Sequence, residues 1–373
     1  MAADPKLQTV DMLLNMGPQH PSTHGVFRVV LTIDGERIVD AEPHIGYLHR
    51  GTEKLCEREN YRQIITLFDR LDYVANFNNE LVFVMAAEKL MGLEAPERAQ
   101  FIRVILAELN RIASHMLFYG AYGTDVGVFG TAFMYGFRER ERIEQLFESV
   151  TGARMMHGYF RVGGVADDLP DGFAGHLRTV LDDLKRAVEE CDRLLTYNEV
   201  FLERTLTIGA ITGQEAIDYG VSGPLLRASG VPMDVRVAEP YLVYDRFDYE
   251  IPLGKNGDCW DRYWVRIEEM RQSIAIVEQA LAILPGGPIQ APVAKFGFVR
   301  PPPGDVYFRA ENPRGDFGVY LVSQGGNTPY RVKIRAPSFC NLMALKRMTV
   351  GHYIADVVVI LGSLDIVLGE VDR

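Results

Sequence analysis

Two histidines, His20 and His24, have the i, i+4 spacing at which a helix presents two metal ligands on one face. Pro21 lies between them, and Gly17 and Gly25 flank the segment, so we do not expect the helix that such a pair requires. We therefore predict an irregular loop and no metal pair at this position.

Most generic signatures of catalysis or cofactor binding are missing from the sequence. It has no GxGxxG after a strand, no GxxxxGK[ST], no HExxH and no GxSxG. Its cysteines are scattered and form no CxxC pair that could hold zinc or an iron–sulfur cluster. We expect all four thiols to be buried, reduced and inert: Cys56, Cys191, Cys259 and Cys340.

Three side chains could nevertheless move protons: His24, Tyr73 and Asp125. An imidazole titrates near neutral pH, a phenol is a weak acid, and a carboxylate can orient an imidazole and raise its pKa. Each residue also has an ordinary structural interpretation. His24 could cap its loop, Tyr73 could fill a core, and Asp125 could cap a turn or helix. The residue types alone leave both interpretations open.

The elements that must position these residues begin with β structure near the N-terminus. Asp11 to Met16 and Gly25 to Ile33 have the pattern of strands, and Asp34-Gly35 predicts a tight turn into a third strand, Arg37 to Ala41. The loop that carries His24 therefore joins the first two strands.

The middle of the chain has helical periodicity. Pro96 suits the first turn of a helix, Thr131 to Val150 predicts another, and Asp258 is expected to cap one that ends at Leu284. Apolar residues at alternating steps of four and three predict a packed seam along a further helix: Leu177, Leu181, Leu184, Val188, Cys191 and Leu195.

The last third returns to β structure before it ends in helices. Proline and glycine from 285 to 303 indicate a loop, Asp305 to Ile334 alternates like a small sheet, and Ser338 opens a helical region. We predict an α+β fold with a mostly helical bundle core. The chain would form a single domain over residues 1–373, with an N-terminal β region (1–50), a helical core (51–285) and a β region with C-terminal helices (286–373).

Composition limits the class of protein. The 373 residues are 47% hydrophobic and 24% charged, as in a globular chain, and the net charge of −11 does not suggest nucleic-acid binding. We see no signal peptide and no apolar run long enough to span a membrane. We expect a cytosolic protein whose membrane attachment comes through partners.

Several long strings of the sequence are improbable from its composition: Asn15 to Gly25, Gly46 to Lys54, Phe68 to Tyr73, Arg154 to Gly164, Lys333 to Phe339 and Gly369 to Arg373. They resemble the D subunit family of respiratory complex I, the NADH:quinone oxidoreductase, and they occur in family order over nearly the whole chain.

The resemblance implies the fold of nickel–iron hydrogenase large subunits, which hold their metal with two CxxC pairs. This chain has no cysteine around His49 to Lys54, and it has Val367 and Glu370 where the C-terminal pair would lie. Without thiolates no nickel–iron centre can be held, so we expect no metal on this chain.

The resemblance further implies a quinone headgroup in the vacated cavity, at the interface with a small subunit that carries a [4Fe–4S] cluster. His24 and Tyr73 would bond the two quinone carbonyls, and Asp125 would lie behind His24. Arg50 and His157 would lie near the partner's cluster. Reduction to quinol takes two electrons and two protons, and an imidazole and a phenol are suitable proton donors.

By the same resemblance, the partners are the small cluster subunit, the C-type peripheral subunit and the membrane subunit that forms the quinone channel. NAD and FMN would bind elsewhere in the complex, on the cytoplasmic side of the membrane. Three alternatives stay open: a complex that takes electrons from ferredoxin or another donor, a membrane-bound hydrogenase large subunit, and a scaffold that has lost its site.

Overall fold

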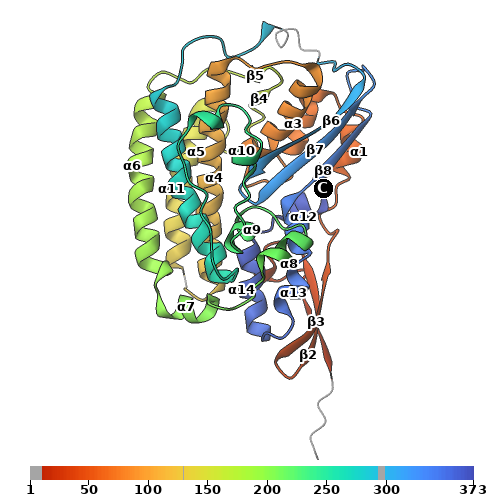
Figure 1. Ribbon diagram of the computed structural model, residues 1–373, viewed down its shortest axis with the longest axis vertical. Helices are drawn as coiled ribbons and strands as arrows, with labels where there is room; N and C mark the ends of the chain where they lie inside the picture. The colour runs from red at the N-terminus through yellow and green to blue at the C-terminus, as the bar shows by residue number, and fades with distance from the viewer. Residues whose placement is uncertain (1–10, 129, 293–298) are drawn as a thin grey trace, which may run out of the picture.

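The computed structural model describes residues 11–128, 130–292 and 299–373, and it combines a bundle of long helices with small antiparallel sheets (Figure 1). This arrangement confirms the α+β class. The strands are β1 (Met12–Met16), β2 (Arg28–Asp34), β3 (Arg37–His44), β4 (Phe160–Arg161), β5 (Gly164–Val165), β6 (Gly304–Asn312), β7 (Gly315–Ser323) and β8 (Arg331–Arg335). The longest helices are α3 (Asn76–Met91), α4 (Glu97–Asp125), α5 (Thr131–Thr151), α6 (Phe173–Cys191), α11 (Cys259–Ala282) and α14 (Ile354–Leu364).

The N-terminal sheet confirms the predicted hairpins. Its order is β1-β2-β3, with Met12 opposite Ile33 and Asp34 opposite Arg37 in an antiparallel register. Alternate residues of β2 are buried, as the period of a strand requires when one face covers a core. The β1–β2 loop contains a short 3-10 helix, η1 (Pro21–Thr23), and the segment that carries His24.

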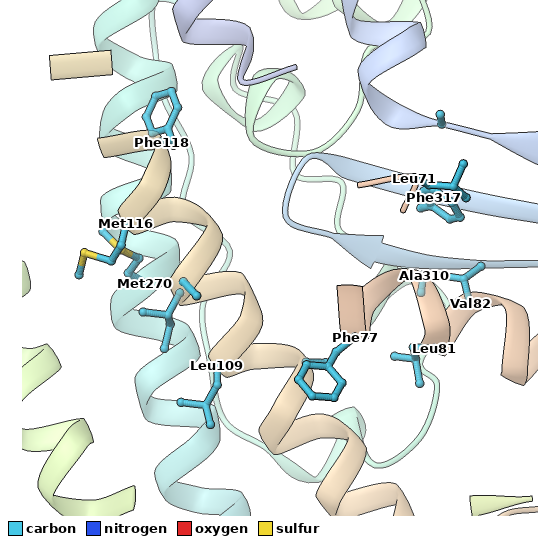
Figure 2. Close-up of a cluster of buried hydrophobic side chains, with 14 of the residues drawn as sticks. Leu71, Phe77, Leu81, Val82, Leu109, Met116, Phe118, Met270, Ala310 and Phe317 are labelled. Carbon is cyan, nitrogen blue, oxygen red and sulfur yellow. The ribbon is translucent and has the colours of Figure 1, made fainter. Parts of the chain in front are cut away.

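Four long helices, α4, α5, α6 and α11, lie side by side and form the bundle (Figure 1). Helix α4 is buried on nearly every side because α3, α5 and α11 all pack against it. Figure 2 shows Met116 and Phe118 of α4 beside Met270 of α11. The predicted seam of α6 is buried as expected. Each fully buried side chain of this size contributes roughly 1.5–3 kcal/mol.

Two parts of the middle region depart from the expected helical pattern. Residues 206–258 form only short helices, among them α8 (Gly213–Asp218), α9 (Pro224–Ala228) and α10 (Val235–Ala238). Close backbone approaches explain this irregularity: a Cβ at Gly254 would lie 2.3 Å from the carbonyl oxygen of Ala228. The second departure is the β4–β5 hairpin, whose two-residue strands are too short to leave an alternating pattern.

The C-terminal third confirms the predicted sheet and helices. Strands β6, β7 and β8 form one antiparallel sheet, and α3 packs against it through Leu81 and Val82, near Phe317 (Figure 2). Helix α14 ends at Asp365, which has a left-handed φ of 54°. The last helix, α15 (Leu368–Asp372), and α12 (Pro337–Leu342) pack against each other beside it.

No helix within the described ranges has the length and apolar character needed to cross a membrane. Three of the four thiols are buried as expected, those of Cys56, Cys191 and Cys259, whereas Cys340 is only half-buried.

Candidate functional site

The loop that carries His24 is fixed at both ends. At its start, a Cβ on Gly17 would lie 1.9 Å from the carbonyl oxygen of Phe27, so only glycine fits this crossing. Near its end, the buried hydroxyl of Thr23 lies within hydrogen-bond distance of the carbonyl oxygens of His20 and Gly25. His24 follows with φ of 55°, in the left-handed region that residues other than glycine rarely adopt.

His24 and Asp125 form an ion pair across the fold. Nε2 of His24 lies 2.6 Å from Oδ2 of Asp125, the last residue of α4, and the two side chains are 22% and 12% exposed. Burial lowers the pKa of His24, but the adjacent Asp125 carboxylate outweighs it, so the net pKa is raised above 6.5. The predicted partnership of the two residues is therefore present in the geometry, and it favours the charged imidazolium.

Asp125 is held in place by α14. A Cβ on Gly362 of that helix would lie 2.7 Å from Oδ2 of Asp125 and 3.0 Å from the ring of Tyr122. The carboxylate thus fills the space that the missing side chain leaves. With Nε2 of His24 directed at Asp125, Nδ1 is the ring nitrogen left to serve another partner.

Tyr73 is half-buried in the connection between α2 (Tyr61–Phe68) and α3. Burial raises the pKa of its phenol above 10, and the negative charge of Asp72 adds to the effect. The hydroxyl therefore stays protonated over the physiological range and can act as a hydrogen-bond donor.

The C-terminal segment joins the two parts of the site. A Cβ on Gly25, next to His24, would lie 2.9 Å from Cδ1 of Leu368, and a Cβ on Gly369 would lie 3.3 Å from Cδ1 of Tyr73. The loop that carries His24 and the ring of Tyr73 therefore contact Leu368 and Gly369, which are successive residues of one segment. The structure thus pairs His24 with Asp125, and this segment connects the loop of His24 to Tyr73.

A buried arginine, Arg314, binds the C-terminal segment at Asp365. Its guanidinium pairs with Asp72 at 2.6 Å and with Asp365 at 3.1 Å, donates to the carbonyl oxygen of Asp365 at 2.6 Å, and reaches the hydroxyl of Ser114 at 3.0 Å. Sequence reasoning missed this network, because its members are far apart in the chain and Arg314 marks only a turn between β6 and β7.

Glu370 is buried in the same segment. One carboxyl oxygen accepts the backbone N–H of Ser338 at 2.8 Å, and the other has no partner among the described residues. Burial, together with the negative charge of Asp72, raises the pKa of Glu370 to about 8. A carboxyl that is partly protonated near neutral pH is a poor substitute for a metal-binding thiolate.

The two residues expected near a partner's cluster lie on other loops. Arg50 is exposed and donates to the carbonyl oxygen of Arg70 at 2.6 Å. Within the described residues it forms no ion pair with Glu53 or Glu57, because Arg331 pairs with both of those carboxylates.

His157 is packed between aromatic rings. Its ring stacks on Phe77 at a centroid distance of 4.0 Å and meets Phe147 edge-on at 5.1 Å. Burial lowers the pKa of His157 to about 4, although its contact with the carbonyl oxygen of Arg154 opposes the shift. The imidazole is therefore neutral at physiological pH.

In the part of the chain that the structure describes, no three His, Cys, Asp or Glu side chains are grouped so that they could hold a metal ion. The polar groups that do converge are donors and acceptors of protons. Such groups are suited to proton transfer.

Comparison with known proteins gives the class of the chain, a subunit of a respiratory-chain oxidoreductase. The family described as "Respiratory-chain NADH dehydrogenase, 49 Kd subunit" matches residues 125–299 and 293–373. The chain is also 52% identical to the D subunit of the NADH-quinone oxidoreductase of Desulforamulus reducens, over 98% of this chain and 99% of that protein.

Two further relatives agree over their full lengths. The D 1 subunit of the NADH-quinone oxidoreductase of a Roseiflexus species is 51% identical over 98% of this chain, and the D subunit from Clostridium beijerinckii is 48% identical over all of it. The chain therefore belongs to the D, or 49 kDa, subunit family of NADH-quinone oxidoreductase.

Proposed function

We propose that this chain forms the quinone headgroup site of a proton-translocating NADH:quinone oxidoreductase. Two observations carry the proposal: His24 pairs with Asp125, and Gly25, next to His24, and Tyr73 lie against the successive residues Leu368 and Gly369. Two different proton donors are thereby associated with one short segment. A quinone has two carbonyl oxygens at opposite ends of its ring, so one donor can serve each.

The chemistry follows from the two acids. Quinone accepts two electrons and two protons and becomes quinol. His24, kept charged by Asp125, would release one proton from Nδ1, and the hydroxyl of Tyr73 would release the other. The negative charge of Asp125 then favours reprotonation of the neutral imidazole from solvent, which prepares the site for another turnover.

The electrons would come from a [4Fe–4S] cluster in an adjacent small subunit, close to Arg50 and His157. We propose that Arg50 faces this cluster with its exposed positive charge, which would raise the reduction potential. His157, neutral and stacked on Phe77, would contribute packing and no charge there.

The same proposal extends to the fold and the assembly. We infer a hydrogenase-large-subunit-like fold in one domain over residues 1–373, with the quinone in the cavity that a metal centre occupies in hydrogenases. The C-type peripheral subunit and the membrane quinone-channel subunit would complete the surroundings on the cytoplasmic side of the membrane. NAD and FMN would bind on other subunits, and NADH is the donor that the relatives' names indicate.

The test is Tyr73→Phe in the purified complex. The variant loses one proton donor and keeps the ring that packs on Gly369, so we expect quinone reduction to fall by at least about tenfold. NADH oxidation with ferricyanide, which needs no quinone site, should be unchanged and reports correct assembly. Tyr197→Phe, at a side chain that is 71% exposed, is the matched control.

Normal quinone reduction in the Tyr73→Phe complex would overturn the role of Tyr73 and would favour the scaffold alternative. Nickel found in the purified complex at one atom per copy of this chain would instead favour the hydrogenase alternative. Reduction of quinone by the purified complex with reduced ferredoxin, and not with NADH, would show that ferredoxin is the electron donor.

A further inference from the structure

Two buried carboxyl groups, Asp69 and Glu80, lie together beneath the segment 158–160. Asp69 follows α2, Glu80 is on α3, and the side chains are 1% and 0% exposed. Oδ2 of Asp69 accepts the backbone N–H of Gly158 at 3.0 Å. Oε2 of Glu80 accepts the next two backbone N–H groups, from Tyr159 at 2.8 Å and Phe160 at 2.7 Å. Three successive amides thus depend on this carboxyl pair.

The other oxygen of each carboxyl group, Oδ1 of Asp69 or Oε1 of Glu80, is fully buried and accepts no hydrogen bond from another group among the described residues. The two side chains lie close enough for each to shift the pKa of the other. Two carboxylates in contact away from water cannot both be ionised, and a hydrogen bond between them needs a proton. Burial, then the charge of Asp69, raises the pKa of Glu80 well above 4.5, and burial also raises the pKa of Asp69, so the pair retains one proton between its two carboxyl groups.

Two arginines lie near the pair, and their positive charges oppose the rise in the pKa of Asp69. Arg70 follows α2 and donates to the carbonyl oxygen of Thr66, and Arg161 of β4 donates to the carbonyl oxygens of Gly158 and Phe160. Neither guanidinium forms an ion pair with Asp69 or Glu80 in the described part of the chain. Arg161 thus binds carbonyl oxygens of the segment 158–160, and the carboxyl pair binds the backbone N–H groups of the same segment.

The clamped segment directly follows Met156 and His157. Met156 has a φ of 58°. Its sulfur lies 3.4 Å from Nδ2, the side-chain amide nitrogen of Asn76, and the same nitrogen donates to the carbonyl oxygen of Asp69. The position of the His157 ring on Phe77 therefore depends on where residues 158–160 are held.

We propose that Asp69 and Glu80 share one proton and act as positioning residues, which clamp residues 158–160 and thereby place Met156 and His157 at the surface that faces the partner's cluster. The clamp itself requires only the observed contacts, whereas its effect on electron transfer rests on the proposed function.

The stability that the Asp69–Glu80 clamp provides should depend on pH. Because the pKa of Glu80 is raised in the folded chain, the contribution of the clamp to stability is complete at acidic pH and declines as pH rises toward that pKa. Loss of the shared proton leaves two negative charges in contact, and their repulsion should separate Asp69 from Glu80. The amides of residues 158–160 then lose their acceptors.

The experiment is hydrogen exchange by mass spectrometry on the purified complex, followed for the peptide around residues 158–160. Exchange rates are divided by the intrinsic chemical rate at each pH. In the native complex we expect protection to fall by roughly tenfold as pH rises through the range in which Glu80 loses its proton, since an amide that loses its acceptor loses about one hydrogen bond of stability.

Glu80→Gln is the informative variant. An amide at this position can accept from Tyr159 and Phe160 through its oxygen and donate to Asp69 through its nitrogen, so it reproduces the protonated acid and cannot titrate. We expect it to keep the protection of the native complex and to remove the pH dependence. Glu80→Ala, which removes the acceptor, should lose protection at every pH.

Two results would overturn the proposal: protection in the native complex that does not change with pH, or Glu80→Gln as unprotected as Glu80→Ala. Quinone reduction measured on the same samples separates this inference from the proposed function. If exchange at residues 158–160 depends on pH as expected while Tyr73→Phe reduces quinone normally, only the proposed quinone site is refuted. Loss of the pH dependence of exchange in Glu80→Gln, without any change in the pH profile of quinone reduction, would refute only the effect on electron transfer.

Discussion

Replacing Asp125 with Asn keeps the shape of the side chain and removes the negative charge that faces Nε2 of His24. The pair has an N–O distance of 2.6 Å and side chains that are 22% and 12% exposed, so solvent screens it only in part. A hydrogen bond between charged groups in such a setting is worth about 1.5–3 kcal/mol. The preference of the ring for its protonated form should fall by roughly tenfold to a hundredfold.

Burial alone lowers the pKa of His24, so the imidazole of the Asp125→Asn variant should be neutral at the pH where the native ring is charged. We expect quinone reduction at neutral pH to fall by at least about tenfold and to recover in part at acidic pH. The assay is NADH:quinone activity across pH, with ferricyanide as the assembly control. Asp171→Asn removes the same charge from an exposed position and should leave the profile unchanged. A native pH profile in Asp125→Asn would refute the idea that this carboxylate sets the charge of His24.

Three further predictions concern the surroundings of the site. Arg314→Gln leaves the buried carboxylate of Asp72 without its ion-pair partner, which costs about 3–5 kcal/mol, and leaves Asp365 with Arg266 alone; it should reduce the amount of this chain that an immunoblot detects in membranes. Glu370→Gln should flatten the dependence of thermal inactivation on pH, because a folded-state pKa of about 8 makes the native chain lose stability as pH rises from 4.5 to 8. Gly362→Ala introduces a Cβ 2.7 Å from Oδ2 of Asp125, and it should lower quinone reduction although alanine favours the helix.

Local patterns predicted most of the elements. Alternation gave the strands around Asp34-Gly35, and the apolar seam from Leu177 gave α6, because both patterns depend on neighbours in the chain. The β4–β5 hairpin and the short helices between 206 and 258 were not predicted. Their conformation depends on glycines that meet distant backbone, which a single sequence does not display.

Only the resemblance singled out the residues of the candidate site. Taken singly, His24, Tyr73 and Asp125 were compatible with ordinary structural roles, and the pairing of His24 with Asp125 joins a loop to the end of a helix about a hundred residues later. The Arg314 network and the carboxyl pair of Asp69 and Glu80 left no signal, because a buried charge is recognisable only when its partner and its burial are known.

The central claim is that the quinone headgroup lies between His24 and Tyr73. A photoreactive quinone that carries its azide on the headgroup would test it directly in the purified complex, with the labelled peptides identified by mass spectrometry. We predict labelling of the loop 17–25 or of the connection around Tyr73, and competition by unlabelled quinone. Labelling confined to other subunits, and equally suppressed by unlabelled quinone, would contradict the account.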